Sequence, residues 1–166
     1  MPRLAPLLVF AAAALLAACD SGPAVDPPSP ADIAGVYDVQ EFRFTPDAGA
    51  LDPAVLLDTL VAADTRLEVL DGGDALFRYR FRGGVQRVLQ GEVEVRAEEV
   101  RLTFDGGADR TSLLLPERLV LTRAGTALAA AEETRANLEA YDRSEYRGFT
   151  DVPGVLALRL ALRSEA

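Results

Sequence analysis

Residues 71–84 read DGGDALFRYRFRGG, and this stretch decides the class of fold. Between its glycine-rich ends, aromatic and basic side chains alternate in the order Phe77, Arg78, Tyr79, Arg80, Phe81, Arg82. Successive side chains of a β-strand point to opposite faces, so one face of this segment is aromatic and the other is basic. The pattern predicts a strand with an apolar inner face between two tight turns, which is typical of an antiparallel sheet.

The same two-residue period recurs along most of the chain. It predicts further strands over residues 34–45, 65–69, 85–96, 100–104, 118–123 and 155–163. Residues 111–115 either form another strand or continue into the next one across Pro116. Gly91 marks a bulge or bend inside its strand. Turn residues separate most of these segments, so we expect hairpin connections.

Two segments depart from this simple alternation. Residues 127–142 are rich in alanine and glutamate, which favours helix, but their alternation favours a strand over residues 133–141. Asp52 as N-cap and Pro53 at the first helical position predict one short helix, ending near Ala63. We expect its apolar side to cover the end of the sheet, with partner binding as the alternative.

About eight short strands joined by hairpins favour a closed barrel, because closure removes the exposed edges of a sheet. We therefore predict an all-β protein with a roughly eight-stranded antiparallel meander barrel and one short helix after the first strand. A strongly bent open sheet is the alternative. The interior of such a barrel is either filled by side chains or wide enough for one small ligand.

The N-terminal residues have the layout of a secretory signal, with Arg3, an apolar run over residues 7–18 and then Cys19. This run spans about 18 Å as a helix, against the roughly 30 Å of a bilayer core, so it is too short for a permanent span. The order Leu16, Ala17, Ala18, Cys19 resembles the bacterial lipobox. The resemblance implies cleavage before Cys19 and lipidation of its thiol. The alternative is an ordinary cleavage site near this cysteine.

This interpretation divides the chain into a signal peptide (residues 1–18), a lipidated cysteine with a proline-rich tether (19–32) and one barrel domain (33–166). It predicts an extracytoplasmic protein of the bacterial cell envelope, anchored to a membrane through its lipid. The choice between inner and outer membrane stays open.

Composition excludes several chemistries. The formal net charge is −9, so the chain is expected to be repelled by nucleic-acid phosphates. The sequence contains no histidine, which excludes a Ser/His/Asp triad, a Cys/His pair and a histidine-ligated zinc site within the chain. Cys19 is the only cysteine, so an internal disulfide is excluded as well. We expect no cofactor and no metal.

Gly35, Val36 and Tyr37 open the first predicted strand. They resemble the Gly-x-Trp start of lipocalin and calycin barrels, with tyrosine in place of tryptophan. Together with the lipobox and the meander, the motif suggests a bacterial lipocalin-like lipoprotein. The resemblance implies structural roles for Gly35 and Tyr37 at the barrel base, where Tyr37 would plug the barrel. It also implies an arginine partner on a late strand, either Arg159 or Arg163.

Phe77, Tyr79 and Phe81 are the candidate ligand-binding residues. Their shared face belongs either to a packed core or to the lining of an apolar pocket. The row of three arginines on the opposite face is expected to be solvated, with binding of an anionic ligand as the alternative.

Acidic residues give weaker candidates. We interpret the acidic, glycine-rich segments 71–74 and 105–109 as hairpin turns, because neither has the ligand series that calcium needs. Four glutamates are expected on outer faces, with an acid and base pair for hydrolysis as the alternative: Glu92, Glu94, Glu98 and Glu99. We predict no catalytic residues.

The sequence thus predicts a noncatalytic, membrane-anchored envelope lipoprotein whose barrel binds a small hydrophobic ligand. The alternative is a protein–protein interaction module or structural lipoprotein with a packed, ligand-free barrel, acting on an envelope partner. A fold of this kind can serve either function, so the distinction depends on the interior and the surface.

Overall fold

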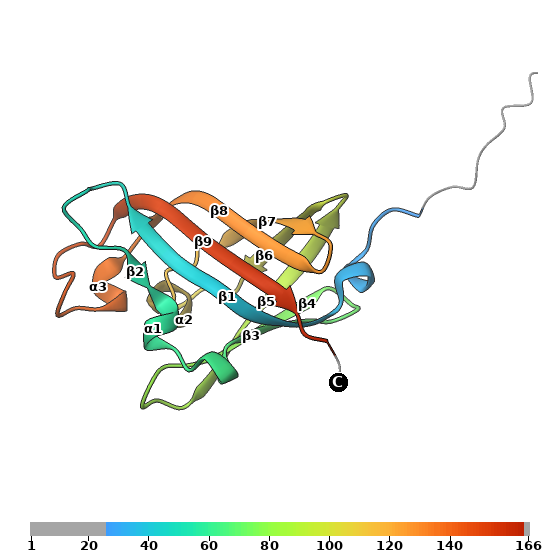
Figure 1. Ribbon diagram of the computed structural model, residues 1–166, viewed down its shortest axis with the longest axis horizontal. Coiled ribbons are helices and arrows are strands. Elements are labelled where there is room, and N and C mark those ends of the chain that lie inside the picture. The colour runs from blue at the N-terminus through green and yellow to red at the C-terminus, as the bar shows by residue number, and fades with distance from the viewer. Residues whose placement is uncertain (1–25, 165–166) are drawn as a thin grey trace, which may run out of the picture.

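Eight antiparallel strands close into a barrel in the computed structural model, which describes residues 26–164 (Figure 1). The sheet contains β1 (Gly35–Pro46), β2 (Ala54–Val55), β3 (Arg66–Val69), β4 (Asp74–Arg80), β5 (Gln86–Arg96), β6 (Glu99–Phe104), β7 (Arg118–Ala124), β8 (Ala127–Ala136) and β9 (Val152–Leu162). Consecutive strands pair from β3 to β9, and β1 closes the ring between β9 and β3. The two-residue β2 is an addition that pairs with the far end of β1. The predicted all-β meander barrel is therefore confirmed.

Closure depends on the long ladder between β1 and β9. It runs from Tyr37 opposite Leu162 to Pro46 opposite Gly154, with one irregularity between Val39 and Glu41. Because this ladder joins the first and last strands of the barrel, the alternative of an open bent sheet is wrong.

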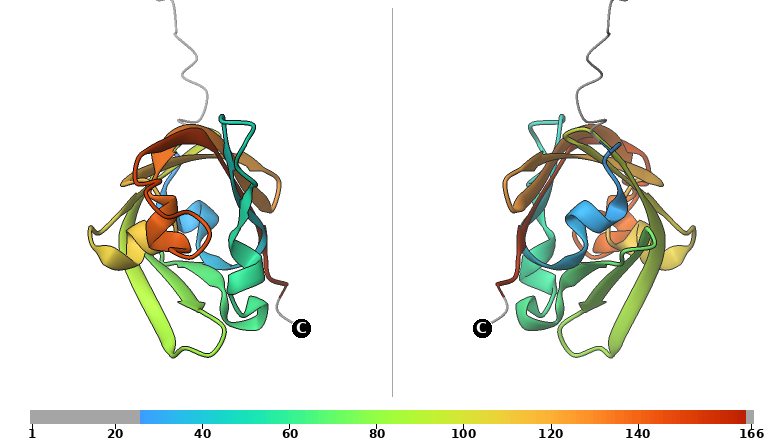
Figure 2. Two further views of the ribbon diagram at one scale, coloured as in Figure 1. Left: turned by 90° about the vertical axis from the view of Figure 1, so that its left-hand side faces the viewer. Right: turned by 90° about the vertical axis from the view of Figure 1, so that its right-hand side faces the viewer.

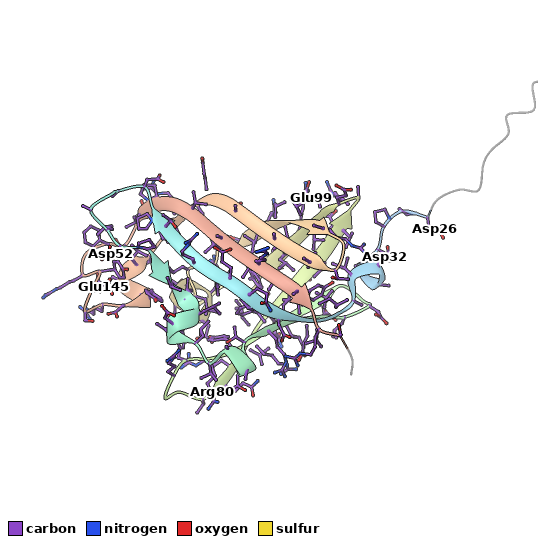
Figure 3. All side chains as sticks on the ribbon, in the orientation of Figure 1. Asp26, Asp32, Asp52, Arg80, Glu99 and Glu145 are labelled. Atoms are coloured by element: carbon purple, nitrogen blue, oxygen red, sulfur yellow. The ribbon has the colours of Figure 1, made fainter. Side chains whose placement is uncertain are left out.

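Buried side chains from every strand of the closed barrel fill its interior: Tyr37, Phe42, Phe44, Leu67, Val69, Ala75, Phe77, Tyr79, Leu89, Val93, Val95, Val100, Leu102, Phe104, Leu119, Leu121, Leu128, Ala130, Leu156, Leu158 and Leu160. At the centre, Phe77 meets Phe42 and Phe104 edge to face, with ring centroids 5.9 and 6.4 Å apart. Each large apolar side chain stabilises the fold by about 1.5–3 kcal/mol when fully buried. Charged side chains such as Arg80 and Glu99 lie on the outside (Figure 3).

Gly91 has a different role from the one expected. Its strand keeps a regular register with β4 on one side and β6 on the other, so no bulge occurs there. A Cβ atom at Gly91 would lie 2.5 Å from the carbonyl oxygen of Thr103 and 3.2 Å from the ring of Phe104. Glycine is needed because the backbone of β5 approaches β6 and the Phe104 ring closely.

The two ends of the barrel are closed differently. We call the end where β1 begins the base, and it is covered by a 3₁₀ helix, η1 (Pro30–Ile33). We call the opposite end the mouth. It carries α1 (Leu56–Thr59), α2 (Ala108–Ser112) and α3 (Leu138–Tyr141), which gather there in Figure 2.

The expected helix over residues 52–63 is much shorter. Residues Ala54 and Val55 instead pair with β1, α1 follows for four residues, and a second 3₁₀ helix, η2 (Ala62–Asp64), comes next. Long-range pairing with β1 outweighs the local N-cap signal here. Leu56 and Leu60 are nevertheless buried, so this segment covers the barrel end as predicted.

Two strand predictions and one turn prediction also differ from the structure. Residues 111–115 contribute to α2 and to a buried run of leucines instead of a strand, and segment 105–109 leads into α2 instead of forming a hairpin turn. The strand expected over 133–141 lies earlier, at β8, and its second half is α3. Asn137 explains the change, since its side chain accepts a hydrogen bond from the Ala140 amide at 3.0 Å and caps α3.

Candidate functional site

The mouth has a polar rim on its inner side. Tyr79 of β4 and Arg87 of β5 are direct neighbours in the register of their strands. Asp109, in the first turn of α2, forms an ion pair with Arg87 at 2.6 Å between Nη1 and Oδ1. This ion pair links β5, and through it β4, to α2. It crosses a gap, because β5 has no strand partner on that side near the mouth.

The hydroxyl of Tyr79 is unusual. The residue is fully buried, yet its hydroxyl has no hydrogen-bond partner among the described residues. Burial raises the pKa of Tyr79 to about 12, and the nearby negative charge of Asp109 adds to the effect. An unpaired buried hydroxyl costs about 1–3 kcal/mol, so Tyr79 is a local weakness in an otherwise apolar core.

A groove of about 450 Å³ lies beside this rim, on the outer side of β5. Val88, Leu89 and Gln90 line one wall, and residues 105–109 line the other. The groove exists because β6 ends at Phe104, whereas β5 continues past it toward the mouth. Its floor reaches the buried Leu89, and Asp109 stands at its rim.

The other side of the mouth is sealed by two tyrosines. The hydroxyl of Tyr141 donates to the carbonyl of Val55 at 3.2 Å, and that of Tyr146 donates to the carbonyl of Asp52 at 3.1 Å. Burial raises the pKa of both phenols, that of Tyr146 to about 12. These bonds tie the segment after β8 to the segment before α1, so this half of the mouth is closed.

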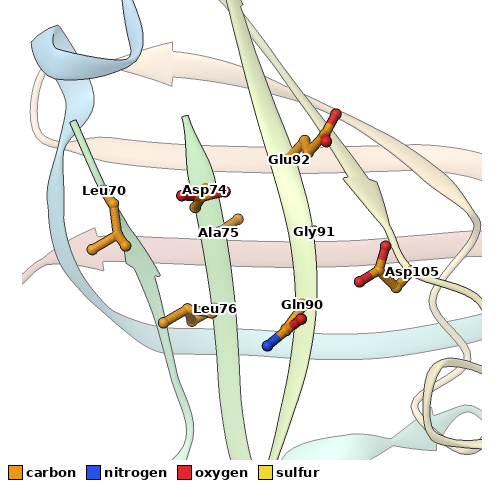
Figure 4. A pocket seen from close by; sticks show the side chains of 8 residues that line it. All are labelled: Leu70, Asp74, Ala75, Leu76, Gln90, Gly91, Glu92 and Asp105. Atoms are coloured by element: carbon orange, nitrogen blue, oxygen red, sulfur yellow. The ribbon is translucent and has the colours of Figure 1, made fainter. Parts of the chain in front are cut away.

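A second groove lies on the outer face of β4 and β5, and Figure 4 shows its lining residues: Leu70, Asp74, Ala75, Leu76, Gln90, Gly91, Glu92 and Asp105. Asp74 lies directly opposite Glu92, and like charges in this position repel. In the part of the chain that the structure describes, no three His, Cys, Asp or Glu residues come together as metal ligands.

The remaining predicted acids mostly bind arginines. Glu94 pairs with Arg96 at 2.6 Å, and Glu99 pairs with Arg101 at 2.5 Å, each two residues away on the same strand. These exposed pairs neutralise charge on the outer surface, whereas Glu92 lines a groove together with Glu94 and forms no ion pair among the described residues.

The structure places the three candidate ligand-binding residues in or near the core. Phe77 and Tyr79 are fully buried, and Phe81 lies half-buried at the mouth with its ring centroid 5.5 Å from that of Tyr79. Neither of the two grooves above is lined by any of the three. Their role in ligand binding stays a prediction.

The arginine row on the other face of β4 is held by carboxylates. Arg78 lies 2.8 Å from Glu68, and Arg80 donates to Asp64 at 2.6 Å. Burial acts against ionisation of Glu68, but hydrogen bonds from Arg78 and Arg66 outweigh it and lower the pKa of this carboxyl. With these partners in place, Arg78 and Arg80 present little unpaired positive charge to an anionic ligand, whereas Arg82 is exposed and forms no ion pair among the described residues.

At the base, Tyr37 lies under η1. Its hydroxyl donates to the carbonyl of Ile33 at 2.7 Å, and burial raises its pKa while the charge of Arg123 lowers it. Arg123 on β7 is thus the cation that acts on Tyr37. The expected partners lie elsewhere, since Arg159 is exposed and Arg163 binds Asp38.

Gly35 begins β1 at the same end. Its φ is +150°, and a Cβ atom there would lie 2.6 Å from Cδ1 of Leu162. The backbone angle requires glycine at the start of β1, whereas the contact could be relieved by a shift of the flexible Leu162 side chain.

Cys19 lies outside the described residues, so its lipidation stays a prediction. Between residues 26 and 164, the helices are all too short or too polar to cross a membrane. Sequence reasoning missed the Arg87–Asp109 pair and the groove beside it. One signal was present, because the strand predicted over 85–96 is longer than its neighbour over 100–104.

The fold and the mouth define the class as a closed, eight-stranded antiparallel barrel with a packed interior and with strand edges that are unpaired toward the mouth, including that of β5. In comparisons with protein-family models, curated proteins and solved structures, the chain matched none of them.

Proposed function

We propose that this chain is a noncatalytic interaction module of the bacterial cell envelope. In this proposal a lipocalin-like barrel is carried on a lipid anchor at Cys19 and binds a partner protein through the mouth. The observation that carries the proposal is the packed interior, in which aromatic and aliphatic side chains occupy the space that a carrier protein keeps for its ligand.

The outer surface supports the same conclusion. Three of the exposed large apolar side chains belong to the mouth end: Val85, Val88 and Phe149. Exposed apolar groups close to unpaired backbone are typical of protein-binding surfaces. The histidine-free sequence and the paired carboxylates give no support to a catalytic function.

Binding of a small hydrophobic ligand near Phe77, Tyr79 and Phe81 is the second candidate. The buried, unpaired hydroxyl of Tyr79 favours it, because a ligand with a polar group would satisfy that hydroxyl. Such a ligand would have to displace core side chains to enter.

Native mass spectrometry of the full chain, purified from its own host in mild detergent, separates the two candidates. For an interaction module we expect the mass of the chain with its lipid, and no further small molecule released on denaturation. A released hydrophobic molecule would overturn the proposal in favour of a carrier. A Cys19→Ser variant is the control for the anchor, and it should lose the lipid mass and the membrane association together.

A further inference from the structure

The edge of β5 nearest the mouth has no strand beside it. Residues 86–90 pair with β4 on one side, but pairing with β6 begins only at Gly91. Across the free edge, the described residues make one backbone hydrogen bond to the loop, from the Asp105 amide to the Gln90 carbonyl at 2.9 Å. An unpaired edge of this kind is a template for another extended chain.

The direction of the free backbone groups follows from that bond. In an antiparallel strand the amide and carbonyl of one residue point to the same side, and alternate residues point to opposite sides. Since the Gln90 carbonyl faces the loop, the amides and carbonyls of Gln86 and Val88 face the same way. The groove therefore presents a short row of backbone donors and acceptors at strand spacing.

The opposite wall leaves room for a chain to enter. Gly106 and Gly107 line the groove without side chains, and a Cβ atom at either would meet no other atom within 4 Å. The side chains of Val88 and Val85 add exposed apolar surface along the strand, with exposed fractions of 39% and 73%. These features suit the close approach of an extended backbone.

The charges around the groove indicate which kind of partner segment can bind there. Arg87 is neutralised by Asp109, whereas Asp105 lines the groove and forms no ion pair within residues 26–164. The whole chain carries a net charge of −9, which disfavours an acidic partner and a second copy of this protein.

We propose that a basic, extended segment of a partner protein adds to β5 as a strand along residues 86–90. This inference rests on the proposed interaction function and gives it a site and a partner chemistry. The backbone of Val88 supplies the central hydrogen bonds, and Asp105 attracts the positive side chains of the incoming segment.

Binding of fluorescent peptides to the purified full chain tests this proposal. The probes are a peptide of alternating Thr and Lys, one of alternating Thr and Glu, and the Thr/Lys peptide with N-methyl groups along one edge of its backbone. We expect the Thr/Lys peptide to bind, N-methylation to weaken binding about tenfold, and the acidic peptide to bind still more weakly. Equal binding of all three would overturn the proposal.

Variants of the protein locate the site. Val88→Pro removes the amide that faces the groove and leaves the hydrogen bonds to β4 in place, so it should weaken Thr/Lys binding about tenfold. Val88→Ala keeps the amide and is the matched control, with an expected change below about twofold. Asp105→Asn should reduce the preference for Lys over Glu. If Val88→Pro binds like the wild type, the proposed edge is wrong.

Photo-crosslinking separates failure of the β5 site from failure of the proposed interaction function. The crosslinking residue is placed at Val88, and the control carries it at the exposed Val120 of β7. Partner crosslinks at Val120 and not at Val88 would overturn the β5 site while leaving an interaction module. A crosslink at Val88 to a second copy of the chain would overturn the basic partner. A small molecule released from the barrel would instead overturn the proposed function itself.

Discussion

The base and the mouth of the barrel differ in how completely their polar groups and strand edges are paired. At the base, the Tyr37 hydroxyl donates to Ile33 and the ladders from β5 to β9 continue to the strand ends. At the mouth, the Tyr79 hydroxyl has no partner and β5 has a free edge. β7 and β8 also separate toward the mouth, where the carboxylate of Glu132 accepts a hydrogen bond from the Val120 amide at 3.2 Å.

This difference separates stability from function. Groups that are fully paired hold the barrel closed and offer nothing to a partner. Unpaired groups reduce the stability of the mouth, and they are the groups that a partner can satisfy. Equivalent changes at the two ends are therefore expected to have unequal effects on the free energy of unfolding.

The largest effect is expected for Tyr37→Ala. The change removes a buried ring and leaves the Ile33 carbonyl without its hydrogen bond, so it should lower the free energy of unfolding by about 3–5 kcal/mol. Urea unfolding followed by circular dichroism measures the loss. The control is Phe149→Ala at the mouth, where the exposed ring should contribute less than about 0.5 kcal/mol. Similar losses for both variants would remove the distinction between the ends.

The next largest effect is a loss of stability at high pH. Tyr79 and Tyr146 at the mouth both have a pKa raised by burial to about 12 in the folded state. A raised pKa means that the folded state holds the proton more tightly, so this stabilisation is complete below the unfolded pKa of about 10. It is lost as pH rises through 12, by about 2–3 kcal/mol for each group.

Urea unfolding measured between pH 9 and about pH 12 tests this prediction. Tyr146→Phe should make the curve of stability against pH less steep, since one titrating group is gone. An unchanged slope in Tyr146→Phe would show that this phenol does not control the alkaline limit.

Features that depend on neighbouring residues in the sequence were predictable, whereas features that depend on contacts between distant segments were not. Alternation in β4 and β9 is local, so both strands and their inner faces were predictable from a few residues. The place of β2 was not, because Ala54 and Val55 extend only through pairing with Phe44 and Arg43 of β1. Local N-cap signals favoured a helix there.

The candidate site was less predictable for the same reason. Arg87 and Asp109 are 22 residues apart and meet only after the barrel has closed. Whether the Tyr79 hydroxyl finds a partner depends on every element at the mouth. The free edge of β5 was the one part open to inference, since the two neighbouring predicted strands differed in length.

A smaller and more diagnostic effect comes from removing one hydroxyl at each end. Tyr37→Phe should lower the free energy of unfolding by about 1–2 kcal/mol, because the buried Ile33 carbonyl loses its donor. Tyr79→Phe should leave it unchanged or raise it by up to about 1 kcal/mol, because the lost hydroxyl had no partner. Both variants are measured in the same urea titration. An equal loss in Tyr79→Phe would reveal a hydrogen bond at the mouth and contradict the comparison.

The smallest effects concern the two ion pairs at the ends, Arg87–Asp109 at the mouth and Arg163–Asp38 at the base. All four side chains are about 40–50% exposed, so Asp109→Asn and Asp38→Asn should each change stability by less than about 1 kcal/mol. Their effects on tyrosine titration should nevertheless differ. Asp109 helps to raise the pKa of Tyr79, whereas Asp38 does not act on Tyr37.

Ultraviolet titration of the phenols detects this difference without unfolding the protein. Asp109→Asn should lower the pKa of Tyr79, one of the two phenols with a pKa of about 12, and the shift should disappear when Tyr79→Phe is combined with it. Asp38→Asn should leave the titration as in the wild type. A shift from Asp109→Asn that persists in the double variant would assign the effect to another tyrosine. The polar rim would then not extend to the buried hydroxyl, and Tyr79 would belong to the core alone.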